Sequence, residues 1–298
     1  MESEWSHNIG QILMGSIYEA VHELCSHLFG FLFFYLNSQI EWAQSELKQP
    51  IDQWNPSVFV LIRDIVAKDV CIPIAAAFIT FIFCFEIVQL LQDENRMRNI
   101  NKQTLFVTIM KFCLCCVLCA KSFDIVMGIY SIGTSAVTIL GNQANGTLNS
   151  NLLSFDEILP AAFDEYRLAY VFQIIGDLLL IVFAIIIVVV LSAIIYVRIT
   201  VWFLEFLIYA SMAPIPFSTF DNKEWAQVGM NYTRKMLALS FEGFFMLLML
   251  AMYGFITAGL SARHDFIETL TMLLGTGVAL IMLMGKAGNI SASIFNAH

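Results

Sequence analysis

Long apolar runs with few charges dominate the chain and predict helices that cross a membrane. A helix needs roughly twenty apolar residues to span the ~30 Å hydrocarbon core of a bilayer. Gaps between charged residues locate such runs, and five of them have an apolar centre with at most one charge. The predicted spans lie near 70–91, 104–120, 174–198, 236–262 and 269–285.

A sixth apolar stretch, Phe206 to Phe220, is shorter and carries Pro214 and Pro216. Proline removes a backbone donor and clashes with the preceding turn, so this stretch cannot form one regular span. It is either a broken or re-entrant segment, or a helix that ends at Ala213 against the membrane surface. Both interpretations place it against other protein, because irregular backbone is tolerated at membrane depth only there or beside a water-filled path.

Residues 1–69 predict neither a span nor a simple loop. Apolar residues recur at helical spacing from Ile12 to Phe29, and Pro50 and Pro56 break the pattern further on. An amphipathic helix at the membrane interface fits this spacing. Residues 122–173 predict an external loop, after an extension of the second helix through Ile125 to Gly141.

The distribution of basic residues predicts the orientation, because Lys and Arg concentrate in cytoplasmic loops. The connections 92–103 and 221–235 each hold three basic residues, whereas 122–173 holds one basic residue against five acidic ones. Residues 1–69 carry nine acidic residues against three basic ones. We therefore expect the N-terminus outside and the C-terminus in the cytoplasm, which requires that 206–220 does not cross.

Composition supports a membrane protein and excludes a soluble enzyme. The 298 residues are 59% hydrophobic and 13% charged, against roughly a quarter charged in soluble domains, and their mean hydropathy is +0.76. The net charge of -9 argues against a surface that coats nucleic acid, but not against a channel that passes it. The cysteines at 113, 115, 116 and 119 are interpreted as small residues at lipid depth, because no loop or His accompanies them as a metal site requires. No cofactor, metal or catalytic motif is predicted.

Charged residues within apolar segments are the candidate functional residues, because each costs roughly 2.5–3.5 kcal/mol at the centre of a span. They could relay protons or couple ions, or they could pair with each other and with basic groups across helices. Small residues at every fourth position of the fourth predicted span, continued by two glycines in the fifth, favour close helix packing, within or between subunits. This packing stripe consists of Gly254, Ala258, Ala262, Gly275 and Gly277. The candidate channel and packing residues are Glu86, Lys111, Asp177, Arg198, Glu205, Pro214, Pro216, Glu242, Gly254 and Ala258.

Separate sequence blocks follow one another along the chain from about Val58 onward. They are Leu61–Ile65, Pro73–Ala75, Phe123–Met127, Ser211–Phe217, Glu224–Trp225 with Gly229 and Asn231–Tyr232, Phe241–Gly243, and Ser293–His298. In these blocks the chain resembles the TrbL-like family of conjugal transfer proteins, in the branch found in conjugative elements of Firmicutes.

The resemblance implies a channel or scaffold subunit of a type IV secretion system that supports transfer of single-stranded DNA with its relaxase. It also implies a protein that is not an enzyme and that works with a separate assembly ATPase, a coupling protein and other secretion subunits. The expected partners further include membrane lipid, other copies of the chain and DNA in transit. A secondary transporter or ion-conducting channel using the buried carboxylates is the alternative, and a scaffold that never touches the substrate is a third possibility.

Together, the pattern and the resemblance predict an all-α, polytopic transmembrane bundle. It has about five spans, a proline-broken re-entrant segment and an N-terminal amphipathic helix.

Overall fold

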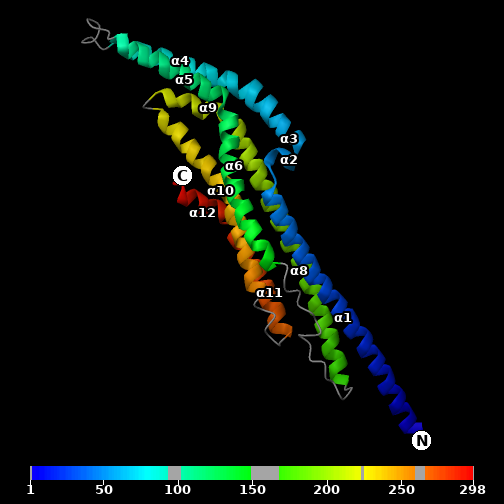
Figure 1. The fold of residues 1–298 in the computed structure, drawn as a ribbon. Coiled ribbons are helices and arrows are strands. Elements are labelled where there is room, and N and C mark those ends of the chain that lie inside the picture. Colours follow the sequence, from blue (N-terminus) through cyan, green and yellow to red (C-terminus); the bar gives the residue numbers. More distant parts are fainter. Residues whose placement is uncertain (1, 93–101, 149–167, 223–224, 259–265, 298) are drawn as a thin grey trace. The chain divides into compact units, whose positions relative to one another are not determined.

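The computed structural model describes residues 2–92, 102–148, 168–222, 225–258 and 266–297, and helices make up nearly all of these ranges (Figure 1). No strand occurs within the described ranges, so the predicted all-α class is confirmed. The elements are α1 Glu2–Lys48, α2 Ile51–Trp54, α3 Pro56–Val60, the π-helical η1 Leu61–Cys71, α4 Ile72–Gln92, α5 Lys102–Ala120, α6 Ser122–Leu148, α8 Leu168–Ser211, α9 Pro214–Phe217, the 3₁₀ turn η3 Ser218–Asp221, α10 Ala226–Ala258, α11 Phe266–Met284 and α12 Ala287–Ile294.

Among the described residues, four helical stretches are long and apolar enough to cross a membrane, and a fifth crossing is available from a bent pair. The bent pair joins Leu270–Met284 to Ala287–Ile294 at 43°. The segment Leu105–Ala120 is a shorter apolar helix. These helices are those of a multi-pass membrane protein. The four long stretches are Pro56–Leu90, Ser122–Asn142, Ile174–Ser211 and Ala226–Thr257.

Two helices differ from the predicted boundaries. The second helix was expected to extend through Ile125 to Gly141 before an external loop. The structure has two helices there, α5 Lys102–Ala120 and α6 Ser122–Leu148, and of these two α6 is long and apolar enough to be a span. The predicted span 174–198 is only the first part of a 38-residue apolar helix that runs to Ser211, which at ~1.5 Å per residue is about 57 Å long. No Gly or Pro occurs between Asp177 and Ala213, so nothing in the sequence ends this helix before Pro214.

The chain divides into two compact units, which we describe separately. Unit 1 comprises residues 1–45, 141–198 and 248–285, and unit 2 comprises residues 46–140, 199–247 and 286–298. In unit 1 a buried cluster joins α1, α8 and α11. Arg198 also donates from Nε to the carbonyl oxygen of Met284 at 3.3 Å. The buried members of the cluster are Cys25, Phe29, Leu32, Ile174, Ile181, Ala184, Val188, Leu270 and Leu273.

The N-terminal region forms one 47-residue helix, as its apolar spacing suggests. Cys25, Phe29 and Leu32 lie on one face of α1 and are buried in the unit 1 cluster, whereas Leu24 is 47% exposed. Part of the predicted amphipathic stripe therefore packs against protein. The two prolines act as predicted breaks, because Pro50 precedes α2 and Pro56 starts α3.

Aromatic side chains fill the centre of unit 2. Trp202, Phe203 and Phe206 of α8 are each at most 1% exposed. Trp54 stacks on Phe203 with ring centroids 4.8 Å apart, and Tyr130 of α6 packs on Phe206 at the same distance. Such pairs contribute about 0.5–1.5 kcal/mol beyond the area that they bury, so α8 is fixed to its neighbours in unit 2.

A glycine allows α6 to approach α10 closely within unit 2. A Cβ atom added at Gly133 would overlap both the hydroxyl and the carbonyl of Ser240. Ser240 also donates from Oγ to the carbonyl oxygen of Ile129 at 2.8 Å. The backbone approach and the hydrogen bond therefore lie at one helix crossing, as small residues permit in membrane proteins.

We expect Gly133→Ala to lower the thermal stability of the purified full-length protein, because α6 must move away from α10. Overpacking of this kind costs about 1–3 kcal/mol. Gly128→Ala is the matched control, since it has the same gain in helix propensity on the same helix but nothing within 4 Å of the added methyl group. Equal melting temperatures for the two variants in one detergent would contradict this packing.

Candidate functional site

The proline-broken segment, Met212 to Asn222, reverses the chain within unit 2. It joins the end of α8 to the start of α10 through α9 and η3. Trp202 donates from Nε1 to the carbonyl oxygen of Leu239 at 2.8 Å, and Tyr232 donates from its hydroxyl to that of Tyr209 at 2.7 Å. Because residue numbers rise along α8 as they fall along α10, these parts of the two helices are antiparallel.

Pro214 and Pro216 lie where the regular helix fails, as predicted. Pro214 is buried at the first position of α9, where its missing N–H is not needed. The break falls at Met212 and Ala213. Residues 206–211, which were expected to belong to the broken segment, instead form the last turns of α8.

Two cysteines of α5 donate hydrogen bonds to backbone carbonyls of the proline-broken segment. Cys119 donates from Sγ to Pro214 at 3.4 Å, and Cys115 contacts the carbonyls of Phe217 at 3.3 Å and Ser218 at 3.5 Å. Both thiols are buried, and residues four apart share one face of a helix. The thiols are weak donors, but they add side-chain hydrogen bonds from α5 to the backbone of the irregular segment.

Hydroxyl groups and a glycine complete the local packing of the segment. Thr219 donates from Oγ1 to the carbonyl of Pro216 at 2.8 Å and accepts from the backbone N–H of Gly229 at 3.2 Å. A Cβ atom at Gly229 would lie 2.9 Å from the Phe220 ring and from the Pro216 oxygen. The start of α10 therefore approaches the broken segment more closely than a side chain at position 229 would allow.

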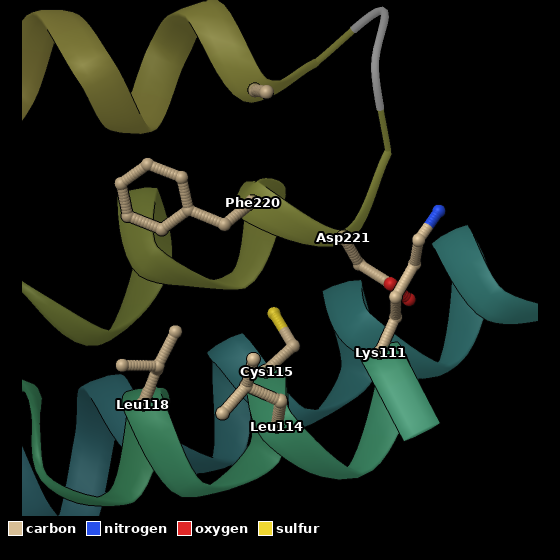
Figure 2. Close-up of a pocket in the computed structure, with 7 residues that line it drawn as sticks. Lys111, Leu114, Cys115, Leu118, Phe220 and Asp221 are labelled. Atoms are coloured by element: carbon tan, nitrogen blue, oxygen red, sulfur yellow. The ribbon is translucent and has the colours of Figure 1, made fainter. Parts of the chain in front are cut away.

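A cavity of about 310 Å³ lies between α5, η3 and the start of α10. Lys111 and Asp221 line one end, and Leu114, Leu118 and Phe220 line the rest, with Cys115 between (Figure 2). Glu86 of α4 lies within electrostatic reach of both charged residues. Burial raises the pKa of the Asp221 carboxyl above its ordinary value, and the Lys111 ammonium opposes that shift.

The other charged candidates are distributed over both units. Within unit 2, Glu205 of α8 lies 3.5 Å from Lys235 of α10, whose ammonium lies 5.4 Å from the centroid of the Tyr209 ring. Asp177 is half-buried on α8 in unit 1, the unit in which Arg198 contacts the Met284 carbonyl. The structure thus brings two predicted candidates, Glu86 and Lys111, close to each other. The partner of Glu205 is Lys235, which the sequence analysis assigned to the connection 221–235.

Glu242 is 3% exposed, and its carboxylate lies at the first turn of α12. A Cβ atom at Gly288 would be 3.0 Å from Oε1 of Glu242. The first N–H groups of a helix lack intrahelical partners and favour negative charge. Ser291 of α12 also donates from Oγ to the carbonyl of Ala238 at 2.6 Å. The buried carboxylate therefore lies where α12 packs on α10.

The predicted packing stripe is described only in part. Gly254 is buried in α10, while the side chain of Ala258 and all of Ala262 lie outside the described residues. In unit 1, Gly277 of α11 admits the Leu191 side chain, which a Cβ atom would meet at 3.0 Å, whereas Gly275 has nothing within 4 Å. Only one of the two glycines that continue the stripe thus serves a close approach.

Sequence reasoning did not select Asp221 or Lys235 as site residues, and it missed the donor role of Cys115 and Cys119. It gave Gly229 as part of a sequence block but not as a point of close helix approach. The spacing of the two cysteines shows that they share a helix face, but not what that face meets. Among the described residues, no group of three or more His, Cys, Asp or Glu side chains could hold a metal ion. The site offers charge, thiol donors and a cavity.

Comparison with known protein families identifies the family of this chain. A family model described as TrbL/VirB6 plasmid conjugal transfer like protein matches residues 36–214, which is more than half of the 298 residues. The matched range includes α4, α5, α6 and α8 and ends at Pro214. No curated protein and no solved structure matches the chain. The resemblance to the TrbL-like family is confirmed.

Replacing both thiol donors, Cys115→Ala with Cys119→Ala, should lower the melting temperature of the purified protein. Each lost hydrogen bond contributes about 1 kcal/mol, and the carbonyls stay buried without that donor. Cys113→Ala with Cys116→Ala is the control, because both of these side chains are exposed on the same helix. We expect Ser at 115 and 119 to retain more stability than Ala. Equal melting temperatures for the two double Ala variants would show that the thiols of Cys115 and Cys119 do not stabilise the segment.

Proposed function

The chain belongs to the family of TrbL/VirB6 plasmid conjugal transfer like proteins, and from that premise we propose its role in a conjugal transfer apparatus. Family membership makes it a component of a type IV secretion system. Within that system, we propose that it is the membrane subunit that supports passage of single-stranded DNA with its attached relaxase. The family match over residues 36–214 carries this proposal.

The geometry supports a rigid membrane subunit rather than a site of chemistry. Irregular backbone at membrane depth must be covered by protein or face water. Here α9 and η3 pack against α4 and α5, and Cys115 and Cys119 donate to their carbonyls. The proline-broken segment thus needs no water-filled path of its own. A scaffold that holds the apparatus together without touching DNA is therefore the nearest alternative.

A secondary transporter or ion channel is the more distant alternative. Such a protein needs acidic groups that exchange protons or ions during its cycle. Glu205 lies beside Lys235, and Glu242 lies at the start of α12. Both carboxylates, half-buried Glu205 and buried Glu242, have local structural surroundings that account for their positions, which favours the secretion subunit.

The proposed topology has the N-terminus outside and the C-terminus in the cytoplasm. Because α8 and α10 are antiparallel across the proline-broken segment, the chain turns back there. The segment packs against α4 and α5, whose connection carries Arg96 and Arg98. Both observations support a common cytoplasmic side for the two basic connections. Proposed partners are the assembly ATPase, the coupling protein and further copies of the chain.

Deleting the gene in frame from a donor cell that carries its conjugative element should abolish transfer. Growth and membrane potential should stay unchanged, because a secretion subunit is not needed for either. Expression of the full-length chain from a second locus should restore transfer. Transfer at the undeleted frequency from a verified deletion would refute the proposed function.

Formaldehyde crosslinking of donor cells during transfer distinguishes a channel from a scaffold. A subunit that lines the path should be recovered with transferring DNA by immunoprecipitation, and a scaffold should not. A donor without the coupling protein is the control, since no DNA enters the apparatus there. Absence of DNA from the wild-type precipitate would refute the channel role and support the scaffold role.

The topology predicts the labelling of a single cysteine placed at Val228, which is 51% exposed near the start of α10. In a background with the seven native cysteines changed to Ser, Val228→Cys should resist a membrane-impermeant maleimide in intact cells and react after permeabilisation. Ser at 115 and 119 keeps a hydrogen-bond donor there. Asn151→Cys, in the predicted external loop, should react in intact cells. Labelling of the Val228→Cys protein in sealed cells would refute this topology.

A further inference from the structure

The cavity beside the proline-broken segment has one charged end and one apolar end. Its volume of about 310 Å³ is at the lower limit of small-molecule pockets, roughly 300–1,000 Å³. Lys111 and Asp221 form the charged end, and Leu114, Leu118 and Phe220 form the apolar end (Figure 2). An occupant that matches both ends must be amphiphilic.

Asp221 carries the evidence for a missing partner. Its side chain is 6% exposed, and neither carboxylate oxygen has a hydrogen-bond partner among the described residues. A buried carboxylate without a partner is costly. Because Asp221 lines the cavity, a cationic donor bound there would supply the partner.

Lys111 makes a simple cation a poor occupant. Its ammonium lies at the same end of the cavity as Asp221, so it repels a metal ion and attracts an anionic group. A ligand that carries both an ammonium and a phosphate satisfies the two side chains together. The apolar side chains then need a hydrocarbon portion.

Leu114 shows from where such a ligand can enter. It lines the cavity and is also 61% exposed. Its neighbours Met110 and Val117 on α5 are 55% and 59% exposed, so the cavity is continuous with an apolar outer face. In a membrane protein that face contacts lipid.

We propose that this cavity binds a zwitterionic phospholipid with a primary ammonium headgroup. The ammonium donates to Asp221, the phosphate contacts Lys111, and the start of one acyl chain lies along Leu114, Leu118 and Phe220. The volume admits the headgroup region and the beginning of a chain rather than a whole lipid. This inference stands independently of the proposed role in DNA transfer.

Lipid retention by the purified full-length protein tests the proposal. The protein is exchanged into mixed micelles with equal amounts of phosphatidylethanolamine and phosphatidylcholine that have identical acyl chains, and retained lipids are counted by mass spectrometry after removal of free micelles. The two lipids differ in that the trimethylated ammonium of phosphatidylcholine has no N–H to donate. A charge-assisted hydrogen bond corresponds to a preference of roughly tenfold for phosphatidylethanolamine.

Asp221→Asn should abolish this preference, and Lys111→Gln should reduce retention of both lipids. Glu205→Gln is the matched control, because it removes a carboxylate outside the cavity, and it should keep the preference. Lys223→Gln should also keep it, which separates a lipid site from an ion pair between Asp221 and Lys223. Each variant is compared with the wild-type protein only if the two have the same gel-filtration profile.

A photoactivatable phosphatidylethanolamine supplies a second measurement on the unaltered chain. We expect its crosslinks on the α5 peptide that contains Leu114 and Leu118. Equal retention of the two lipids by the wild-type protein, an unchanged preference in Asp221→Asn, a lost preference in Lys223→Gln, or crosslinks only outside α5 and η3 would each overturn the proposal.

Discussion

The need to satisfy every backbone polar group without water is the constraint on which the structure of unit 2 depends. A helix does so internally, but Pro214 and Pro216 remove two donors where α8 ends. The carbonyls of Ala210 and Met212, four residues before the two prolines, accept from the N–H groups of Ala213 and Ile215 instead. The α5 helix adds thiol donors to the carbonyls of Pro214, Phe217 and Ser218. The break in one helix is thereby coupled to the side chains of another, and the cysteines become structural.

Local contacts also accommodate the charged residues of α8 and α10. Glu205 lies beside Lys235, and Glu242 lies where α12 starts. The contact between Glu205 and Lys235 joins the antiparallel helices α8 and α10. Glu242 lies where α12 packs on α10. Asp221 differs, because its oxygens have no partner among the described residues while a cavity lies beside them. Among these three acidic residues of unit 2, Glu205 and Glu242 therefore serve helix packing, and Asp221 faces a cavity.

The sequence predicts the apolar helices well, because charge gaps and prolines act locally. The break before Pro214 and the starts of α2 and α3 are found where expected. Helix over Ile125 to Gly141 was expected, but the full extent of α6 to Leu148 and the length of α8 could not be predicted, since the polar residues at 142–148 and Arg198 are compatible with continuing helix. Partners distant in sequence, such as Cys115 with Phe217, could not be predicted, because a spacing shows a face but not what covers it.

Crosslinking between α5 and the proline-broken segment in native membranes tests the central claim most directly. With the exposed Cys84, Cys113 and Cys116 changed to Ser, Phe220→Cys places a thiol beside Cys115 across the cavity. A protease site inserted between residues 149 and 167 then separates the two halves of the chain unless they are joined. We expect a short bismaleimide to hold the cleaved fragments together under denaturing conditions. Fragments that separate after crosslinking, although both thiols have reacted, would contradict the packing of this segment on α5.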